Sequence, residues 1–186
     1  MGAAGASKLQ DIGQAIKKFK NSGKPIYANG NYYTQGQYYL AAHADHVYLH
    51  PMGSVFLNGY GVYRQFFKSA LEKLMVQFHV FRVGSYKSAL EPILRDDMSE
   101  YAKEANLAWL EVLWDAYKSD VADLRGLKPD DIDDYINNKP NHLARAGGDK
   151  AQLALDYGLV DALKTRNEFR LELIGLVGKD EDKQSF

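Results

Sequence analysis

The chain of 186 residues lacks cysteine, any long apolar run and an excess of charge of either sign. Without cysteine it can form no disulfide bond, no cysteine-ligated zinc site and no cysteine nucleophile. None of its apolar runs approaches the roughly 20 residues that a membrane-spanning helix needs. The 23 Lys and Arg residues against 24 Asp and Glu residues give a net charge of −1, so electrostatics give no reason to expect nucleic acid as a partner.

The two ends of the chain also lack familiar features. Its first six residues, MGAAGA, are small and uncharged, and they have neither the basic region nor the apolar core of a signal peptide. Because the chain also ends abruptly, at Gln184-Ser185-Phe186, we expect it to be a fragment of a longer protein. Its length and its 46% hydrophobic content favour one folded domain. We assign this domain to residues 1–178 and a flexible charged tail to residues 179–186.

The first third of the chain alternates between helix-like and strand-like segments. Apolar residues at helical spacing predict a helix around residues 9–19, and a short strand follows at residues 25–28. Residues 35–44 then favour a helix, and residues 46–50 the next strand, which Pro51 ends. Such an alternation is typical of βαβ units, so the sequence predicts an α/β fold with a parallel sheet.

The remaining two thirds are predicted to mix helices with further short strands, the first of them at residues 55–57. An amphipathic pattern indicates a helix at residues 62–74, and an alternating run rich in β-branched and aromatic residues indicates a strand at residues 77–83. A long helix is expected from about Glu100 to Arg125. Its apolar set is wider than one core-facing stripe needs, which fits a contact with a subunit or repeat, or burial between its own sheet and a neighbouring helix. Residues 147–163 predict a helix, a capping glycine and a last strand.

The position of one lysine suggests chemistry. Lys87 follows the predicted strand of residues 77–83 and Gly84, where the backbone is free to turn. A lysine at the end of a buried strand can have a lowered pKa, and its neutral amine can act as a general base that takes the proton of a serine hydroxyl. An exposed loop lysine fits the same local pattern and is much commoner. The residues around Lys87 therefore leave both interpretations open.

Three segments of the chain resemble, in the same order, segments of bacterial signal peptide peptidase A, also called protease IV. They are Gly30–Gly53, Phe81–Ser99, which begins F-R-V-G-S-Y-K-S-A-L-E-P, and Gly147–Leu163. The similarity extends over roughly Ile12 to Leu163. It concerns the long form of the family, which is an internal duplication, and this chain resembles only the first repeat.

The resemblance implies a fold and a mechanism. The fold is expected to be ClpP/crotonase-like, with repeated ββα units and a long helical arm. The family cleaves peptides with a Ser-Lys dyad, and Lys87 falls on the position of the general base, whereas the nucleophilic serine belongs to the second repeat. Gln35, before Gly36, matches the position of that serine, and an amide cannot act as an acyl-accepting nucleophile. The nucleophile and the oxyanion hole are therefore expected outside this chain.

The resemblance also implies partners and a location. The expected substrates are cleaved signal peptides and other extended hydrophobic peptides, and no cofactor or metal is expected. The expected protein partners are the C-terminal repeat of the same protein and further copies of it, assembled into a homo-oligomer that is a tetramer in the family. The full-length protein is expected to be anchored in the bacterial inner membrane with its catalytic part facing the periplasm. We expect this chain alone to be soluble, folded and inactive.

The serines of the chain offer another route to catalysis, which the sequence does not favour. Ser85 and Ser88 lie close to Lys87, and Ser54 follows Gly53. None of the three stands in a glycine-flanked nucleophile turn with a separate oxyanion-hole sequence. A self-contained active site is therefore not expected.

Metal binding is also weakly supported. His43 and His46 could share an ion, but a clear carboxylate third ligand is lacking. His46 and His50 lie about 13 Å apart on a strand, too far for one mononuclear site. The acidic residues 130–134 lack the spacing of an EF-hand loop and indicate the start of a helix.

A non-catalytic interpretation stays open beside the peptidase. The chain could be a scaffold or oligomerisation module of a crotonase-like protein. In that case Lys87 is exposed with an ordinary pKa, and the wide apolar helix carries the function. The discriminating observation is whether Lys87 lies in a concave apolar site.

Overall fold

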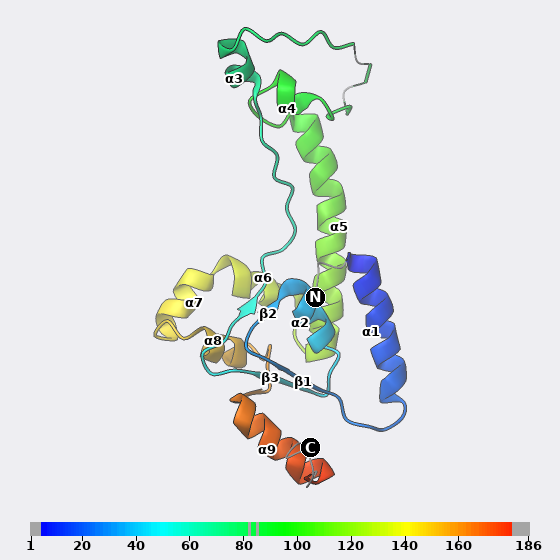
Figure 1. Cartoon of the computed structure of the whole chain (residues 1–186), viewed down its shortest axis with the longest axis vertical. Helices are drawn as coiled ribbons and strands as arrows, with labels where there is room; N and C mark the ends of the chain where they lie inside the picture. The colour runs from blue at the N-terminus through cyan, green and yellow to red at the C-terminus, as the bar shows by residue number, and fades with distance from the viewer. Residues whose placement is uncertain (1–4, 82, 85, 180–186) are drawn as a thin grey trace. The chain divides into compact units, whose positions relative to one another are not determined.

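The computed structural model describes residues 5–81, 83–84 and 86–179 (Figure 1). Contacts between residues divide the chain into two compact units. The first unit combines residues 1–58 with residues 117–186, and the second comprises residues 59–116. The boundary between the domain and the tail at residue 178 stays a prediction, because residues 180–186 of the tail lie outside the described residues.

The first unit contains two small parallel sheets. Its strands are β1 (Tyr27–Gly30), β2 (Tyr33–Thr34), β3 (His46–Leu49), β4 (Val55–Phe56) and β5 (Ala162–Leu163). The larger sheet has the order β1-β3-β5, the smaller one pairs β2 with β4, and every pair is parallel. The predicted α/β fold with a parallel sheet is therefore confirmed.

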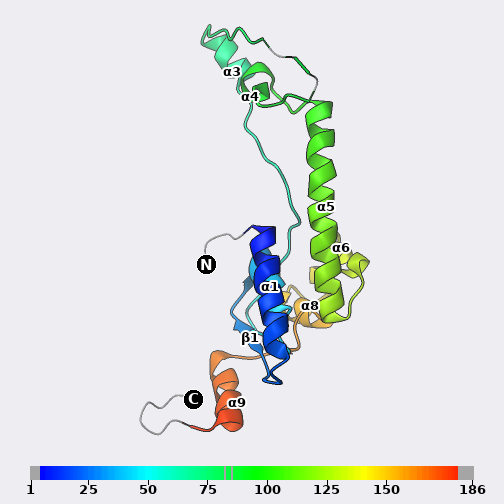
Figure 2. The same cartoon turned by 90° about the vertical axis from the view of Figure 1, so that its right-hand side faces the viewer.

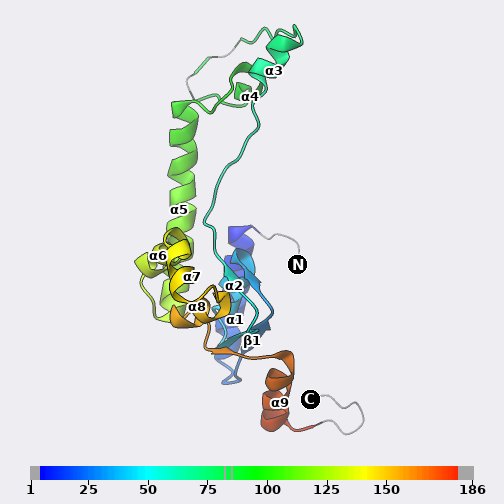
Figure 3. The same ribbon diagram turned by 90° about the vertical axis from the view of Figure 1, so that its left-hand side faces the viewer.

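Helices make up most of the rest of the first unit, with α1 clearest in Figure 2 and α6 to α8 in Figure 3. They are α1 (Ala6–Lys20), α2 (Gln35–Ala41), the C-terminal part of α5 (Glu100–Arg125), α6 (Pro129–Asn137), α7 (Lys139–Arg145), α8 (Lys150–Asp156) and α9 (Arg166–Val177). The bounds of α5 agree with its prediction, and α1, α2, α6 and α8 also have predicted counterparts. Helices α7 and α9 were not predicted.

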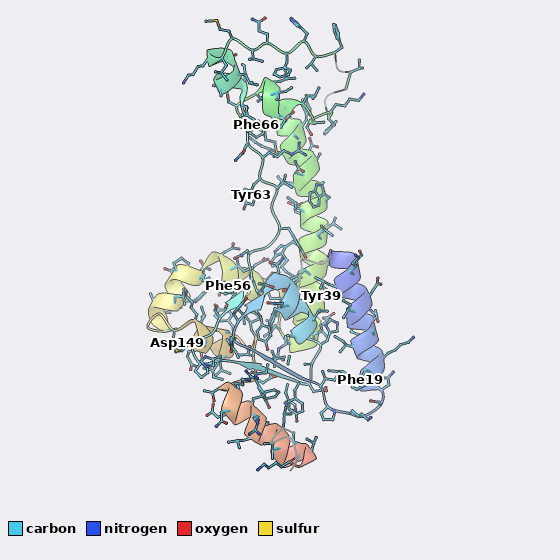
Figure 4. The ribbon with its side chains drawn as sticks, in the orientation of Figure 1. Phe19, Tyr39, Phe56, Tyr63, Phe66 and Asp149 are labelled. Carbon is cyan, nitrogen blue, oxygen red and sulfur yellow. The ribbon has the colours of Figure 1, made fainter. Side chains whose placement is uncertain are left out.

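Local capping signals explain where two of these helices begin. The side chain of Asp149, labelled in Figure 4, accepts hydrogen bonds from the N–H groups of Ala151 and Gln152, at 2.9 Å each, at the start of α8. The hydroxyl of Thr165 accepts from the N–H of Glu168 at 3.3 Å at the start of α9. Both residues satisfy N–H groups that have no partner within the helix itself.

Side chains of β3 alternate between the two faces of the larger sheet. Val47 and Leu49 are fully buried. The ring of Tyr48 contacts Phe169 at 5.9 Å, and its hydroxyl donates to Glu172 at 2.9 Å, so α9 packs against the Tyr48 side. Helix α2 lies on the opposite side of this sheet from α9 (Figure 1). The sheet is therefore covered on both faces, as is usual for parallel sheets.

Buried tyrosine hydroxyls connect distant parts of the first unit. Tyr38 donates to the carbonyl of Leu159 at 2.7 Å, and Tyr135 donates to the carbonyl of Val55 at 2.9 Å. Burial raises the pKa of Tyr38, and it raises that of Tyr135 to about 12. Both side chains are almost fully buried and remain neutral donors, so they stabilise the core with hydrogen bonds as well as apolar area.

The second unit contains α3 (Lys68–Lys73), α4 (Glu91–Leu94) and the first part of α5. The predicted helix at residues 62–74 is wrong over residues 62–67, which are irregular. Tyr63, labelled in Figure 4, lies in this irregular part and is 96% exposed. An amphipathic helix gains most of its stability from packing its apolar face, and on the predicted face Phe67 and Leu74 are 45% and 71% exposed.

The predicted strand at residues 77–83 is also wrong over its described residues, and Arg82 lies outside the described residues. Residues 77–81 and 83 have no regular structure, and Phe81 is fully exposed. A strand requires a second strand with which to exchange backbone hydrogen bonds. The described residues of the second unit include no other strand. The alternating pattern is present in the sequence, but the described part of the second unit gives it no strand with which to pair.

Within the described ranges, no helix combines the length and the apolar character needed to cross a membrane. Even α5, with 26 residues, has acidic and basic side chains spread along its length.

Candidate functional site

Lys87, the predicted general base, lies on the loop between α3 and α4 in the second unit. Gly84 has a φ of 107°, and the N–H of Lys87 reaches the carbonyl of Gly84 at 3.4 Å. The chain therefore turns where the sequence predicts it, at a conformation that favours glycine. Lys87 is exposed, so its predicted position at the end of a buried strand is wrong.

An open cavity of about 660 Å³ borders Lys87 within the second unit. The other residues that line it are Arg64, Phe81, Val83, Tyr86, Ser88, Ala89 and Leu90. Most of this lining is apolar or aromatic. Two of these side chains, Phe81 and Val83, are 100% and 84% exposed, so the cavity is an open hollow on the surface beside the lysine.

The residue before Lys87 is attached to α5. The hydroxyl of Tyr86 donates to the carboxylate of Glu104 at 3.1 Å, and its ring contacts that of Tyr101 edge to face at 5.3 Å. The hydrogen bond to Glu104 raises the pKa of Tyr86. One side of the lysine loop is therefore fixed by an exposed hydrogen bond and a ring contact.

The other side of the loop is attached through Glu91, the first residue of α4. Its side chain is 2% exposed, and it accepts hydrogen bonds from the N–H of Ser99 at 3.2 Å and the hydroxyl of Ser99 at 2.5 Å. Glu91 lies within the segment Phe81–Ser99, and no local sequence pattern indicates a role for it. An acidic residue at a helix start is normally exposed and favoured by the helix dipole, so the sequence carried no signal of its burial.

Gln35, which matches the position of the family nucleophile, lies in the first unit at the start of α2. Its side-chain oxygen accepts from the N–H of Asn58 at 3.0 Å, and its carbonyl accepts from the hydroxyl of Tyr117 at 3.0 Å. The amide therefore has a structural use, connecting α2 to the segment after β4.

The three serines considered as nucleophiles differ in their surroundings. Ser88 is half-buried and lines the cavity beside Lys87. Ser54 is buried in the first unit, where its carbonyl accepts from the N–H of Tyr33 at 3.0 Å. Ser85 lies outside the described residues. That none of them acts as a nucleophile stays a prediction.

The histidines considered for a metal site are engaged separately. His43 is buried, and its Nδ1 lies 2.8 Å from the carbonyl of Tyr39; burial lowers its pKa. The ring of His46 stacks on Tyr27 at 4.7 Å, and Nδ1 of His50 accepts from the N–H of Met52 at 3.1 Å. Over the described parts of the chain, no three His, Cys, Asp or Glu side chains come together in a way that could hold a metal ion.

Comparison with known proteins places these residues in a family context. Residues 18–174 match the model of peptidase family S49. The chain is 45% identical over 155 residues to protease 4 of Salmonella typhi and 42% identical over 177 residues to protease 4 of Haemophilus influenzae. It is 26% identical over 182 residues to the chloroplastic serine protease SPPA of Arabidopsis thaliana.

These matches cover most of this chain and a small share of each relative. They include 83%, 94% and 98% of the chain, respectively, but only 25%, 28% and 26% of the relatives. The chain therefore spans about a quarter of the length of the proteins it matches. Lys87, its cavity and Glu91 all fall inside the matched region.

Proposed function

The chain belongs to peptidase family S49, and from this we propose that it forms part of a serine endopeptidase that degrades cleaved signal peptides. In this proposal Lys87 is the general base of a Ser-Lys dyad, and the serine and the oxyanion hole lie outside this chain. The observation that supports it is the position of Lys87 on the lining of a largely apolar cavity. The complete protein is proposed to have ClpP/crotonase-like repeats, of which this chain is the first.

The proposed reaction uses the amine of Lys87 twice. Neutral Nζ takes the proton of the serine hydroxyl while Oγ attacks the peptide carbonyl, and a tetrahedral intermediate forms. When the C–N bond breaks, the ammonium returns the proton to the leaving amine and an acyl-enzyme remains. Water then attacks the ester with the same assistance, which releases the acid product and regenerates the serine.

This chemistry requires Lys87 to be neutral, and burial of an amine favours its neutral form. Lys87 is exposed in this chain. We propose that the serine-bearing repeat covers the cavity and removes water from the amine. The same step brings the nucleophile within hydrogen-bond reach, so this chain is expected to be inactive alone.

The proposed substrates are signal peptides and other extended hydrophobic peptides. The support is the lining of the cavity, where Phe81, Val83 and Leu90 can contact apolar side chains beside the reacting bond. The proposed setting is the bacterial inner membrane, with the catalytic part facing the periplasm.

The proposed protein partners are the C-terminal repeat and further copies of the chain, in a tetramer. The second unit supports this proposal because large apolar side chains are exposed on it to an extent unusual for a monomer's surface. Those at least 68% exposed are Tyr63, Leu74, Met75, Phe81, Val83 and Val112.

The test compares Lys87→Ala and Lys87→Arg with wild type in the full-length protein. We expect both variants to lose peptidase activity by roughly 10²–10⁴-fold or more, since arginine stays charged and cannot act as a neutral base. Lys103→Ala is the matched control, because Lys103 is another exposed lysine of the second unit, paired with Glu100. Appreciable activity in a folded Lys87 variant removes this residue from the chemistry.

The exposed apolar surface also supports the second candidate, a non-catalytic scaffold or oligomerisation module. Lys87 is exposed, as expected for the scaffold, and it also lines a concave apolar site, as expected for the peptidase. The two candidates differ in the Lys87 variants. A scaffold retains its assembly state and whatever activity its parent has, whereas the peptidase retains assembly and loses activity.

A further inference from the structure

Glu91 is a buried carboxylate to which nothing so far assigns a function. It is 2% exposed and ranks among the largest fully buried side chains of the described residues. Burying a carboxylate is costly unless hydrogen bonds compensate, so a buried one usually fixes a particular local arrangement.

Its side chain joins α4 to the start of α5. Both donors of Ser99, the N–H at 3.2 Å and the hydroxyl at 2.5 Å, point to the Glu91 carboxylate. The Ser99 hydroxyl in turn accepts from the N–H of Ala102 at 3.2 Å and so caps α5. Glu91 is thereby connected, through one serine, to the first turn of a 26-residue helix.

The backbone of Glu91 also connects α4 to the loop that carries Lys87. The N–H of Glu91 donates to the carbonyl of Ser88, the residue after Lys87, at 3.1 Å. The carbonyl of Glu91 accepts from the N–H of Arg95 at 2.9 Å and so closes the single turn of α4. Lys87 therefore lies four residues before the buried Glu91, and the backbone of Glu91 holds Ser88, the residue next to Lys87.

We propose that Glu91 is a positioning residue that holds Lys87 in the geometry needed for proton transfer from the serine. The inference rests on the proposed function of Lys87. Tyr86 attaches the loop on its other side, but through an exposed hydrogen bond, so Glu91 supplies the buried attachment. Small displacements of a catalytic group are expensive, since misplacement by about 1 Å can cost about 10²-fold in rate.

The chain offers a matched control in Asp96. Its carboxylate also accepts two hydrogen bonds from one serine, the N–H of Ser69 at 2.8 Å and its hydroxyl at 2.6 Å. Asp96 differs in being exposed and in attaching α3 rather than the lysine loop. Asp96→Ala removes an equivalent pair of bonds from the same unit and leaves Ser88 and Ser99 untouched.

The experiment measures peptidase kinetics in the full-length protein for Glu91→Ala, Glu91→Gln and Asp96→Ala. We expect Glu91→Ala to lower kcat by about 10- to 100-fold with little change in KM. Glu91→Gln is expected to fall between it and wild type, because its amide oxygen keeps one acceptor. Asp96→Ala is expected to stay close to wild type. The acidic limb of the pH–rate profile should move to higher pH in Glu91→Ala, because a displaced amine is better hydrated and more readily protonated.

A merely structural role gives a different result. Partial unfolding lowers the amount of active enzyme and the plateau of the profile, and it leaves the acidic limb in place. Amide hydrogen exchange then reports on the loop directly: Glu91→Gln, the milder change, should accelerate exchange at residues 86–90, and Asp96→Ala should not.

Two outcomes overturn the proposal in distinguishable ways. Full activity of Lys87→Ala overturns the proposed function together with the role of Glu91. Loss of activity in Lys87→Ala, with wild-type kinetics and unchanged exchange at residues 86–90 in the Glu91 variants, overturns the role of Glu91 alone.

Discussion

Arg125, the last residue of α5, connects three parts of the first unit through its guanidinium. Its Nε and Nη2 donate to the carbonyl of Gly158 at 3.1 and 3.0 Å, and Nη2 and Nη1 reach the carboxylate oxygens of Asp161 at 2.6 and 3.3 Å. Asp161 also accepts from the N–H of Val47 at 2.7 Å. The ion pair between Arg125 and Asp161 thus connects α5 with the turn after α8 and with strand β3.

We predict that Arg125→Met lowers the free energy of unfolding by about 2–3 kcal/mol. Removing one partner of a buried ion pair costs roughly 3–5 kcal/mol, whereas an exposed pair contributes roughly 0.2–1 kcal/mol. The side chain of Arg125 is 8% exposed and that of Asp161 is 38% exposed, so this pair falls between the two limits. Methionine retains most of the apolar stem, so the packing loss is small.

Urea unfolding followed by far-UV circular dichroism measures this loss as a lower midpoint at an unchanged m-value. The control is Lys103→Met, which removes a lysine that pairs with Glu100 at 2.7 Å where both side chains are largely exposed. We expect the control to leave the midpoint unchanged, because exposed pairs are screened by water. An Arg125→Met midpoint equal to that of the control refutes the reasoning.

The difference in the free energy of unfolding between wild type and Arg125→Met should also depend on pH, which gives an independent check. Burial raises the pKa of Asp161, but the hydrogen bonds from Arg125 and Val47 outweigh it, and the pKa lies below its ordinary value. Such a carboxyl stabilises the fold above its unfolded pKa of about 3.9, and the contribution is lost as the pH falls through the folded value. The difference between wild type and Arg125→Met should be constant near neutral pH and shrink below about pH 4. A difference that grows on acidification contradicts this assignment.

Two further predictions concern the packing and hydrogen bonding of the first unit. A Cβ placed at Gly13 lies 2.5 Å from Nε2 of the buried His43, so Gly13→Ala should destabilise the fold by about 1–3 kcal/mol. A Cβ placed at Gly175 in α9 meets no atom within 4 Å, so Gly175→Ala should stabilise the fold by about 0.5–1 kcal/mol. Thermal unfolding measures both, and shifts of the same sign in the two variants contradict the packing argument. Tyr135→Phe leaves the buried carbonyl of Val55 without its donor at 2.9 Å and should cost about 1–2 kcal/mol; an unchanged midpoint in urea shows that the bond adds no net stability.

The first unit could be predicted because its sequence signals are local. Short patterns of apolar, turn and capping residues predict strands at β1 and β3 and the helix α2 between them. They also predict the turn at Gly158 after α8, where φ is positive. Helix α9 was missed for the corresponding reason. Leu171, Leu176 and Val177 are exposed on it, so its apolar residues do not form a clear stripe along one face.

The site was harder to predict because its features depend on contacts that no local pattern encodes. The turn at Gly84 and the start of α5 at Glu100 follow from residue type. The burial of Glu91 depends on Ser99, eight residues away, and on the packing around both. The cavity beside Lys87 also includes Arg64, which lies far from the other lining residues in the sequence.

The two wrong predictions of secondary structure lie in the second unit, next to Lys87, and this has a physical explanation. An amphipathic pattern at residues 62–74 and an alternating pattern at residues 77–83 both encode a surface that is buried on one side. The N-terminal half of α5 shows the same property, because its broad apolar set is largely exposed, whereas Tyr117 and Val121 farther along are buried. A second polypeptide surface would supply what all three segments lack. The proposed dyad requires a serine from outside this chain, so the proposed function needs such a surface as well.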